Sequence, residues 1–463
     1  MPPPKLSKKI KSIQGVRLAG SSSTWNINLE FPPDSQGIIA SVTPLESSSD
    51  DIQAPLALPA LTHPHIHLDK AYIHNAREYS HLLPCMGTFQ EALCSTTKAK
   101  ESFTEADLLK RGEWLLAESI SSGVTAIRAF VEVDHTVQLI CLDAAIALKS
   151  QWSEACHIQI ACFAQDPIFS SEYGEENRAL IQKALETYSE IDVLGTTPYV
   201  ESSVEASKKN IEWAVDRALL LDKHVDFHLD YNLDPGKEAL IWHVLQTLQQ
   251  RGWTSQTTRR RVMLGHCTRL TLLTDEEWKK LSRFIHENDL PVSFVGLPTS
   301  DLYMAAPAPR DQGGPHQRPR GTLRVPEMIR KHNLDAVIGV NNVGNAFTPW
   351  GSADPLFLAC VGVGVYQAGA QDDAELLYEC VSTRARAAIG LPAETSLVVQ
   401  PGVCPDLVLF HDRDDTGCGI SRPRTSVAEV VWDPPARTSR SIITTGRVQV
   451  GLSGFDNVKF EYA

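Results

Sequence analysis

The chain has 463 residues, of which 43% are hydrophobic and 21% are charged, a composition that suits one large α/β domain with a smaller domain attached. The net charge of -13 argues against nucleic acid or an anionic membrane as the main partner, because both bind basic patches. Ten cysteines occur without a CxxC pair, and no apolar run is long enough to cross a membrane, so we expect a cytoplasmic protein.

The first segment of the chain, residues 1–57, is polar and rich in serine and proline. Two short stretches within it, 24–31 and 37–42, have the composition of β-strands. From residue 58 to residue 396 the pattern changes, and short apolar runs alternate with segments of helical periodicity. The apolar runs predict eight strands, at 58–65, 124–130, 157–164, 193–200, 224–230, 262–267, 291–297 and 336–341.

Eight strand–helix units indicate a (β/α)8 TIM barrel rather than an open doubly wound sheet. In agreement with this, no glycine-rich nucleotide motif follows any of the predicted strands. The last segment gives further strand-like runs, at 397–399, 406–410, 427–431, 441–445 and 447–451. Because both ends of the chain are β-rich, we predict a small β-sandwich domain formed by residues 1–57 and 397–463, attached to a barrel domain of residues 58–396.

Two histidines, His65 and His67, stand at the end of the first predicted barrel strand. Residues two apart in a strand point to the same side, so both imidazoles can reach one point beyond the strand. A divalent metal needs this arrangement from its first two ligands. Alone the pair is a weak signal, because paired strand histidines often face solvent.

Further polar residues occur where later strands end, which is the face on which TIM barrels carry their active sites. Four of the fifteen histidines fall there, namely His65, His67, His228 and His266. The other candidate residues on this rim are Gln165, Asp230, Tyr231, Asp301, Asn341 and Asn342. Their convergence predicts one site for a small-molecule substrate.

These motifs resemble the amidohydrolase superfamily and, within it, the cytosine deaminase branch. The similar segments follow the family's order, at 64–69, 163–165, 226–230, 261–266, 320–325 and 401–407. The resemblance implies a TIM-barrel hydrolase of non-peptide C–N bonds in which His65, His67 and His228 bind one catalytic metal. It also implies that His266 holds the attacking water or the substrate, and that Gln165 hydrogen-bonds the amide-like edge of a substrate ring.

Three positions depart from the family pattern. Asn341 stands where the family has a metal-binding aspartate that takes the proton of the water, and Asn342 stands where the branch has a second aspartate. Tyr231 replaces a glutamate that shuttles protons. An amide cannot accept the proton that a carboxylate with a pKa of about 4 accepts. It also leaves the metal site one unit more positive, which favours hydroxide formation without a strong base.

Three hypotheses stay open at this point. The chain is an altered metal-dependent hydrolase or deaminase, or it runs a non-hydrolytic reaction such as cyclisation, elimination or isomerisation on the same scaffold, or it binds a small molecule without catalysis. We predict the hydrolase, with one divalent transition metal, zinc or iron, and with Asn341 weakly coordinated or linked to the metal through water. A homo-oligomer is compatible with this prediction.

Residue roles follow from this hypothesis. We assign His266, Asn341, Asp230 and Tyr231 to catalysis, and Gln165, Asn342 and Asp301 to substrate binding. The carboxylates of Asp230 and Asp301 are candidates for the missing base, although support of a neighbouring histidine is the commoner role for such groups. We predict that residues 307–319 form a loop on the rim. Phe347 is expected to pack within the loop after the last strand.

Overall fold

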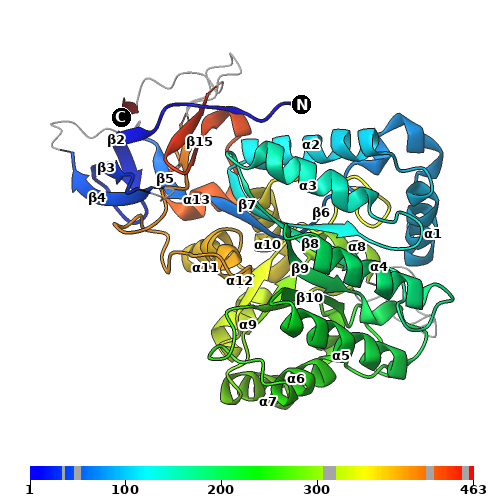
Figure 1. The fold of residues 1–463 in the computed structure, drawn as a ribbon. Helices are drawn as coiled ribbons and strands as arrows, with labels where there is room; N and C mark the ends of the chain where they lie inside the picture. The colour runs from blue at the N-terminus through cyan, green and yellow to red at the C-terminus, as the bar shows by residue number, and fades with distance from the viewer. Residues whose placement is uncertain (34–36, 46–53, 306–319, 413–421, 451–457) are drawn as a thin grey trace.

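Eight parallel strands form a nearly closed barrel with helices around it, which confirms the predicted TIM barrel (Figure 1). This computed structural model describes residues 1–33, 37–45, 54–305, 320–412, 422–450 and 458–463, so the predicted rim loop at 307–319 lies outside the described residues. The barrel strands are β6 (Leu61–His67), β7 (Val124–Glu132), β8 (His157–Ala164), β9 (Ile191–Thr196), β10 (His224–Leu229), β11 (Val262–His266), β12 (Val292–Gly296) and β13 (Ala336–Ile338).

The barrel closes between its first and last strands. Ile66 of β6 forms a parallel bridge with Asn341, which follows β13. The amide of His67 donates to the Asn341 carbonyl at 2.8 Å, and the Asn341 amide donates to the His65 carbonyl at 3.1 Å. The seam that closes the barrel therefore brings Asn341 beside both histidines of the HxH pair.

Helices surround the barrel, and several of them pack directly against its strands. Helix α2 begins at a capping threonine, Thr104, whose side chain accepts from the Asp107 amide, and α7 begins with a capping box between Thr274 and Glu277. The helices are α1 (Phe89–Lys100), α2 (Glu105–Ser121), α3 (Ile140–Trp152), α4 (Gly174–Thr187), α5 (Val204–Leu220), α6 (Ile241–Gln250), α7 (Asp275–Glu287), α8 (Pro298–Met304), α9 (Val325–His332), α10 (Pro355–Tyr366), α11 (Gln371–Glu379) and α12 (Thr383–Ala388).

Strands from the two chain ends form a separate nine-stranded sheet, in the order β1-β16-β15-β14-β5-β2-β3-β4 with β17 paired to β2. In Figure 1 the blue N-terminal strands and the orange and red C-terminal strands lie together at one side of the barrel. The sheet encloses an apolar cluster of its own. Its strands are β1 (Lys5–Leu6), β2 (Ile10–Leu18), β3 (Thr24–Glu30), β4 (Ile38–Pro44), β5 (Leu56–Pro59), β14 (Leu407–Phe410), β15 (Arg440–Thr444), β16 (Arg447–Val450) and β17 (Lys459–Tyr462).

The secondary structure differs from the prediction in four places. The predicted strand at 193–200 ends at Thr196, and Pro198–Val200 form a short 3-10 helix. The apolar run at 58–65 is divided between two sheets, because the Ala60 amide bonds to Asp406 of the terminal sheet and the Leu61 amide bonds to Gly123 of the barrel. The predicted strand at 397–399 is irregular. The predicted strand at 427–431 is helix α13 (Val427–Trp432), which begins with a capping box between Ser426 and Glu429. That local signal outweighs the strand preference of the valines.

None of the helices in the described parts of the chain is both long and apolar enough to span a lipid bilayer.

Candidate active site

Three histidines meet at the strand C-termini, as the sequence predicts. The Nε2 atom of His228 lies 3.1 Å from the Nε2 atom of His65 and 3.1 Å from that of His67. Nitrogens that bind one ion at about 2.1 Å with tetrahedral angles stand about 3.4 Å apart. The arrangement therefore fits three nitrogen ligands around a single divalent metal, and the side chains of all three are buried.

The environment of the three imidazoles keeps them in the form that binds metal. Burial lowers the pKa of His65, and it lowers the pKa of His67 and His228 well below the usual value for histidine. The rings rest on two phenylalanines, with the His65 and Phe130 centroids 4.1 Å apart and the Phe163 and His228 centroids 4.4 Å apart. Neutral imidazoles in an apolar cradle are ready to bind a cation without first losing a proton.

A third histidine on the same strand, His63, does not belong to this cluster. The pairing register of β6 with β7 shifts between His63 and Ile66, which turns the His63 ring to the outside of the barrel. There its Nε2 atom contacts the Ser119 hydroxyl and the Ala353 carbonyl, both at 3.1 Å. The irregularity therefore separates the site histidines from a structural one.

Asn341 completes the fourth side of the histidine cluster. It adopts a left-handed backbone conformation with φ of 65°, which asparagine tolerates better than most residues. Its Nδ2 atom donates to the Ser300 hydroxyl at 2.9 Å. Its Oδ1 atom is buried and has no hydrogen-bond partner among the described residues. A buried carbonyl oxygen without a partner is costly, so this atom also fits a metal or its bound water.

His266 stands next to the cluster and is held from both sides. Its Nδ1 atom lies 2.8 Å from the Asp301 carboxylate, which also accepts from the Thr322 hydroxyl and the Leu297 amide. The Tyr231 ring stacks on the imidazole with centroids 3.9 Å apart. Because the carboxylate requires a hydrogen on Nδ1, the Nε2 atom of the neutral ring is left as an acceptor.

Two of the acidic residues expected in the site, Asp301 and Asp230, bind neighbouring groups and do not line the pocket. Asp301 serves His266, as described above. Asp230 accepts from the backbone amides of Leu240 and Ile241, at 2.9 and 3.0 Å, and so binds the start of helix α6. Burial raises the pKa of Asp230 to about 6. Both of its oxygens are engaged by these amides, which does not support the role of a base.

A buried group of charged side chains forms the opposite wall. Lys70 follows β6, and its Nζ atom lies 2.6 Å from the Glu132 carboxylate and 2.9 Å from the Gln165 Oε1 atom. Lys100 contacts the other oxygen of Glu132 at 2.6 Å. Burial alone would raise the pKa of Glu132, but Lys100 and Lys70 outweigh it and lower that pKa to about 2. The Gln165 Nε2 atom is buried without a partner among the described residues.

The two walls enclose a small cavity on the barrel axis. Its lining residues are His67, Lys70, Gln165, Tyr199, His228, Tyr231, His266, Ser300, Asn341, Asn342 and Phe347. The structure thus brings together most of the residues predicted from the sequence. The Asn342 side-chain Oδ1 atom accepts from the Asn345 Nδ2 atom at 2.7 Å, and the Tyr231 hydroxyl donates to the Ser300 backbone carbonyl at 3.1 Å.

The sequence interpretation missed several residues of this pocket. Lys70 was visible as a charged residue three positions after the HxH pair. Glu132, which pairs with Lys70 but does not line the cavity, was visible as a carboxylate at the end of a long apolar run. Tyr199 and Ser300 carried no local signal, because they belong to short helical turns after β9 and β12. Phe347 was expected to pack its own loop, whereas it lines the cavity.

Solved structures with similar folds are enzymes. A 5-methylcytosine deaminase from Klebsiella pneumoniae superposes with a TM-score of 0.75 and 22% identity, over 94% of this chain and 96% of that one. An N-isopropylammelide isopropylaminohydrolase from Burkholderia multivorans gives a TM-score of 0.70 and 20% identity, over 95% and 98% of the two chains.

An atrazine chlorohydrolase from Arthrobacter aurescens, solved with zinc, gives a TM-score of 0.62 and 15% identity, over 94% of each chain. No protein-family model matches the chain, and no curated protein matches it by sequence. At these identities the similarity establishes the fold. It is the fold that the resemblance to the amidohydrolase superfamily implies.

Proposed function

We propose that the protein is a metal-dependent hydrolase or deaminase that acts on C–N bonds of small cyclic or amide-like molecules. The observation that carries the proposal is the convergence of the His65, His67 and His228 Nε2 atoms, with separations of 3.1 Å, at the C-terminal face of the barrel. The similar structures support it, because their names include a deaminase and an aminohydrolase, and one of them was solved with zinc.

The chain's own residues divide the chemistry among them. His65, His67 and His228 would hold one zinc or iron ion, with the Asn341 Oδ1 atom facing it directly or through water. When bound, such an ion lowers the pKa of a coordinated water toward neutrality. The His266 Nε2 atom, left as an acceptor by Asp301, takes the proton that a carboxylate at position 341 would otherwise take.

Substrate recognition falls to the opposite wall. The Gln165 Nε2 atom is a buried donor without a partner among the described residues, and it fits a carbonyl oxygen or an unprotonated ring nitrogen. Tyr199, Tyr231 and Phe347 offer aromatic faces to a flat ring. Burial raises the pKa of the two tyrosines, so both hydroxyls are neutral at physiological pH.

A non-hydrolytic reaction is the second candidate, and one observation favours it. The lining of the cavity, as far as the structure describes it, includes no carboxylate. A cyclisation, elimination or isomerisation that needs only a Lewis acid and a histidine would suit this set of groups. Because Tyr231 stands where the family has the proton-shuttling glutamate, simple cytosine deamination is a poor candidate for the reaction.

Metal analysis and a substrate screen test the proposal together. Protein purified without chelators should contain about one equivalent of zinc or iron, and His228→Ala should remove it, whereas His81→Ala at an exposed position should not. The metal-loaded protein is then assayed on pyrimidines, triazines, hydantoins and lactams, with ammonia release and ring opening both followed. Less than about one tenth of an equivalent of metal, with no gain on reconstitution, contradicts the proposal. Conversion without uptake of water establishes the non-hydrolytic candidate.

A further inference from the structure

The charges around the cavity are unbalanced. Among its lining residues, as far as the chain is described, Lys70 alone carries a formal charge at neutral pH. The carboxylates of Asp301, Glu132 and Asp226 lie near the cavity, but they do not line it and each is paired with a neighbour. Asp301 is bound by His266, Thr322 and Leu297, while Glu132 lies between two lysines. A molecule in the cavity therefore meets a cationic and neutral surface.

The histidine wall adds to this imbalance when the site holds its metal. A divalent ion bound by three neutral imidazoles and a neutral amide keeps its full double charge. In a buried site such charge is costly, because little water is present to solvate it. The Asp226 carboxylate lies 3.5 Å from the His65 Nδ1 atom, but it also pairs with Arg128 and does not line the cavity. A carboxylate ligand at position 341 would supply part of the missing negative charge, but Asn341 supplies none.

Lys70 is also prepared to contact a ligand. An ammonium group has three hydrogen-bond donors, and two of those on Lys70 are directed to Glu132 and Gln165. Its Nζ atom lies 5.5 Å from the ring centroids of both Phe163 and Phe347, so its surroundings are otherwise aromatic. Glu132 fixes the ammonium in place from behind and leaves one donor for the cavity.

We propose that the site takes a substrate that is itself an anion at neutral pH, a flat ring with its negative charge spread over an N–C–O or O–C–C–C–O unit, and that Lys70 determines this specificity. This inference rests on the proposed function for the presence of the metal. The ring binds between the aromatic side chains, with one anionic oxygen toward Lys70 and Gln165. The negative charge of the ring takes the place of the charge that a carboxylate at position 341 would supply.

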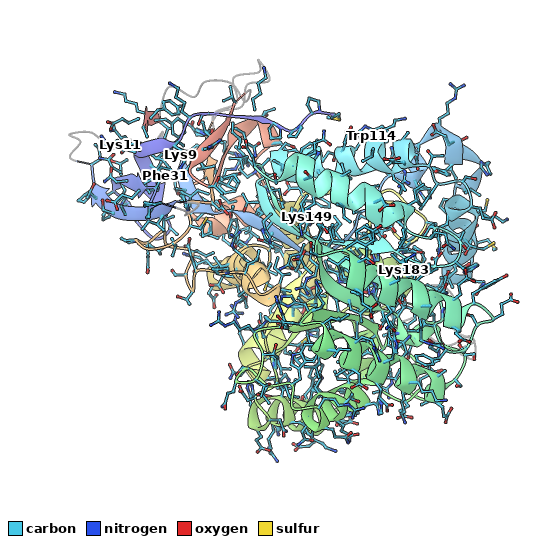
Figure 2. All side chains as sticks on the ribbon, viewed as in Figure 1. Lys9, Lys11, Phe31, Trp114, Lys149 and Lys183 are labelled. Carbon is cyan, nitrogen blue, oxygen red and sulfur yellow. The ribbon has the colours of Figure 1, made fainter. Side chains whose placement is uncertain are left out.

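Two ring compounds of similar size test the proposal by isothermal titration calorimetry on the metal-loaded protein. Barbiturate is an anion at neutral pH, and uracil is neutral. We expect barbiturate to bind at least about tenfold more tightly, as a buried charge-assisted hydrogen bond does relative to its neutral counterpart. Lys70→Gln should weaken barbiturate by about tenfold and change uracil by less than about threefold. Lys183→Gln, which removes the same charge from an exposed position on α4 (Figure 2), should change neither.

A second variant keeps the test decisive if Lys70→Gln does not fold. Asn341→Asp leaves the lysine wall intact and supplies the missing negative charge, so it should reduce the preference for barbiturate by about tenfold or more. Equal or tighter binding of uracil by the wild-type protein overturns the inference. The inference is also overturned if a folded Lys70→Gln variant, or the Asn341→Asp variant, keeps the full preference for barbiturate over uracil. These failures are distinct from failure of the proposed function, which is judged by metal content and turnover.

Discussion

The two walls of the cavity differ in how completely their polar atoms are paired. On one wall, Lys70 pairs with Glu132 at 2.6 Å, and Glu132, outside the cavity lining, pairs with Lys100 at the same distance. On the other wall, three imidazole nitrogens face each other, and the side-chain Oδ1 atom of Asn341 has no hydrogen-bond partner among the described residues. The ion pairs of the first wall stabilise the folded chain, whereas the unpaired atoms of the second are free to bind a ligand. Stability and function are therefore expected to respond differently to changes on the two sides.

The largest expected effect is on the paired wall. Glu132→Gln leaves the buried Lys70 ammonium without its ion-pair partner, while Lys100 keeps Asp134 and Asp166. Removal of one partner from a buried ion pair typically costs about 3–5 kcal/mol of folding free energy. Urea unfolding measures this loss, with Glu186→Gln on the exposed face of α4 as the matched control. In the metal-free protein, His67→Asn should cost much less. Equal losses for Glu132→Gln and His67→Asn would remove the distinction between the walls.

Metal removal should affect the histidine wall alone. A ligand present at about a thousand times its dissociation constant stabilises the folded state by about 4 kcal/mol. Chelation should therefore lower the Tm of the wild-type protein, and addition of zinc should restore it. In His65→Ala or His228→Ala, neither treatment should shift the Tm, while the Lys70 network stays intact. A metal-dependent Tm that persists in both variants would place the metal somewhere else.

The same contrast explains what the sequence predicted. The sequence placed the HxH pair and the histidines at the ends of β10 and β11 on one rim, and their rings lie close together in the structure. Strand periodicity and barrel topology together fix where those side chains point. The network behind Lys70 was not predicted. Its members come from β7, α1 and the segments after β6 and β8, and no local pattern shows that Lys100 of a helix reaches Glu132 of a strand. Hydrophobic periodicity predicts which face of an element is buried, but it does not predict which long charged side chains on different elements pair with each other.

The direction of a carboxylate was equally hard to foresee. Asp230 follows β10 with φ of 49°, and this left-handed conformation turns its side chain toward the amides at the start of α6. Periodicity alone had placed it on the same face as His228. Asp301 lies on α8, a short helix that the sequence did not indicate, and it therefore meets His266 instead of the cavity.

Asn341→Asp tests whether the unpaired wall has been adapted to its present chemistry. The change adds an anionic ligand, so metal affinity should rise. It also removes the amide donor to the Ser300 hydroxyl and repels an anionic substrate. Loss of such a contact costs about 1–3 kcal/mol, so we expect native activity to fall about five- to a hundredfold. Steady-state kinetics on the substrate found in the screen measure this change. A variant as active as the wild type, more so with Tyr231→Glu added, would instead identify a weakened ancestral hydrolase.

The smallest expected effect separates two histidines of a single strand. His224 begins β10 at the opposite end from His228, and its Nδ1 atom accepts from the Arg261 amide at 2.9 Å. Burial, with nearby arginines, lowers its pKa from 6.5 to about 3. The folded protein thus excludes a proton that the unfolded chain takes up, and the stability from neutral His224 is complete above pH 6.5 and is lost as the pH falls toward 3.

Each pH unit in that window removes up to about 1.4 kcal/mol. His224→Asn keeps an acceptor near the Nδ1 position for the Arg261 amide but does not titrate, so the free energy of unfolding should fall less steeply below pH 6.5 than in the wild type. Urea unfolding at a series of pH values, with the metal removed from both proteins, measures the two slopes. Because the site histidines titrate in both proteins, only the difference between the slopes belongs to His224. Equal slopes would mean that protonation of His224 does not reduce the free energy of unfolding, and would contradict the prediction.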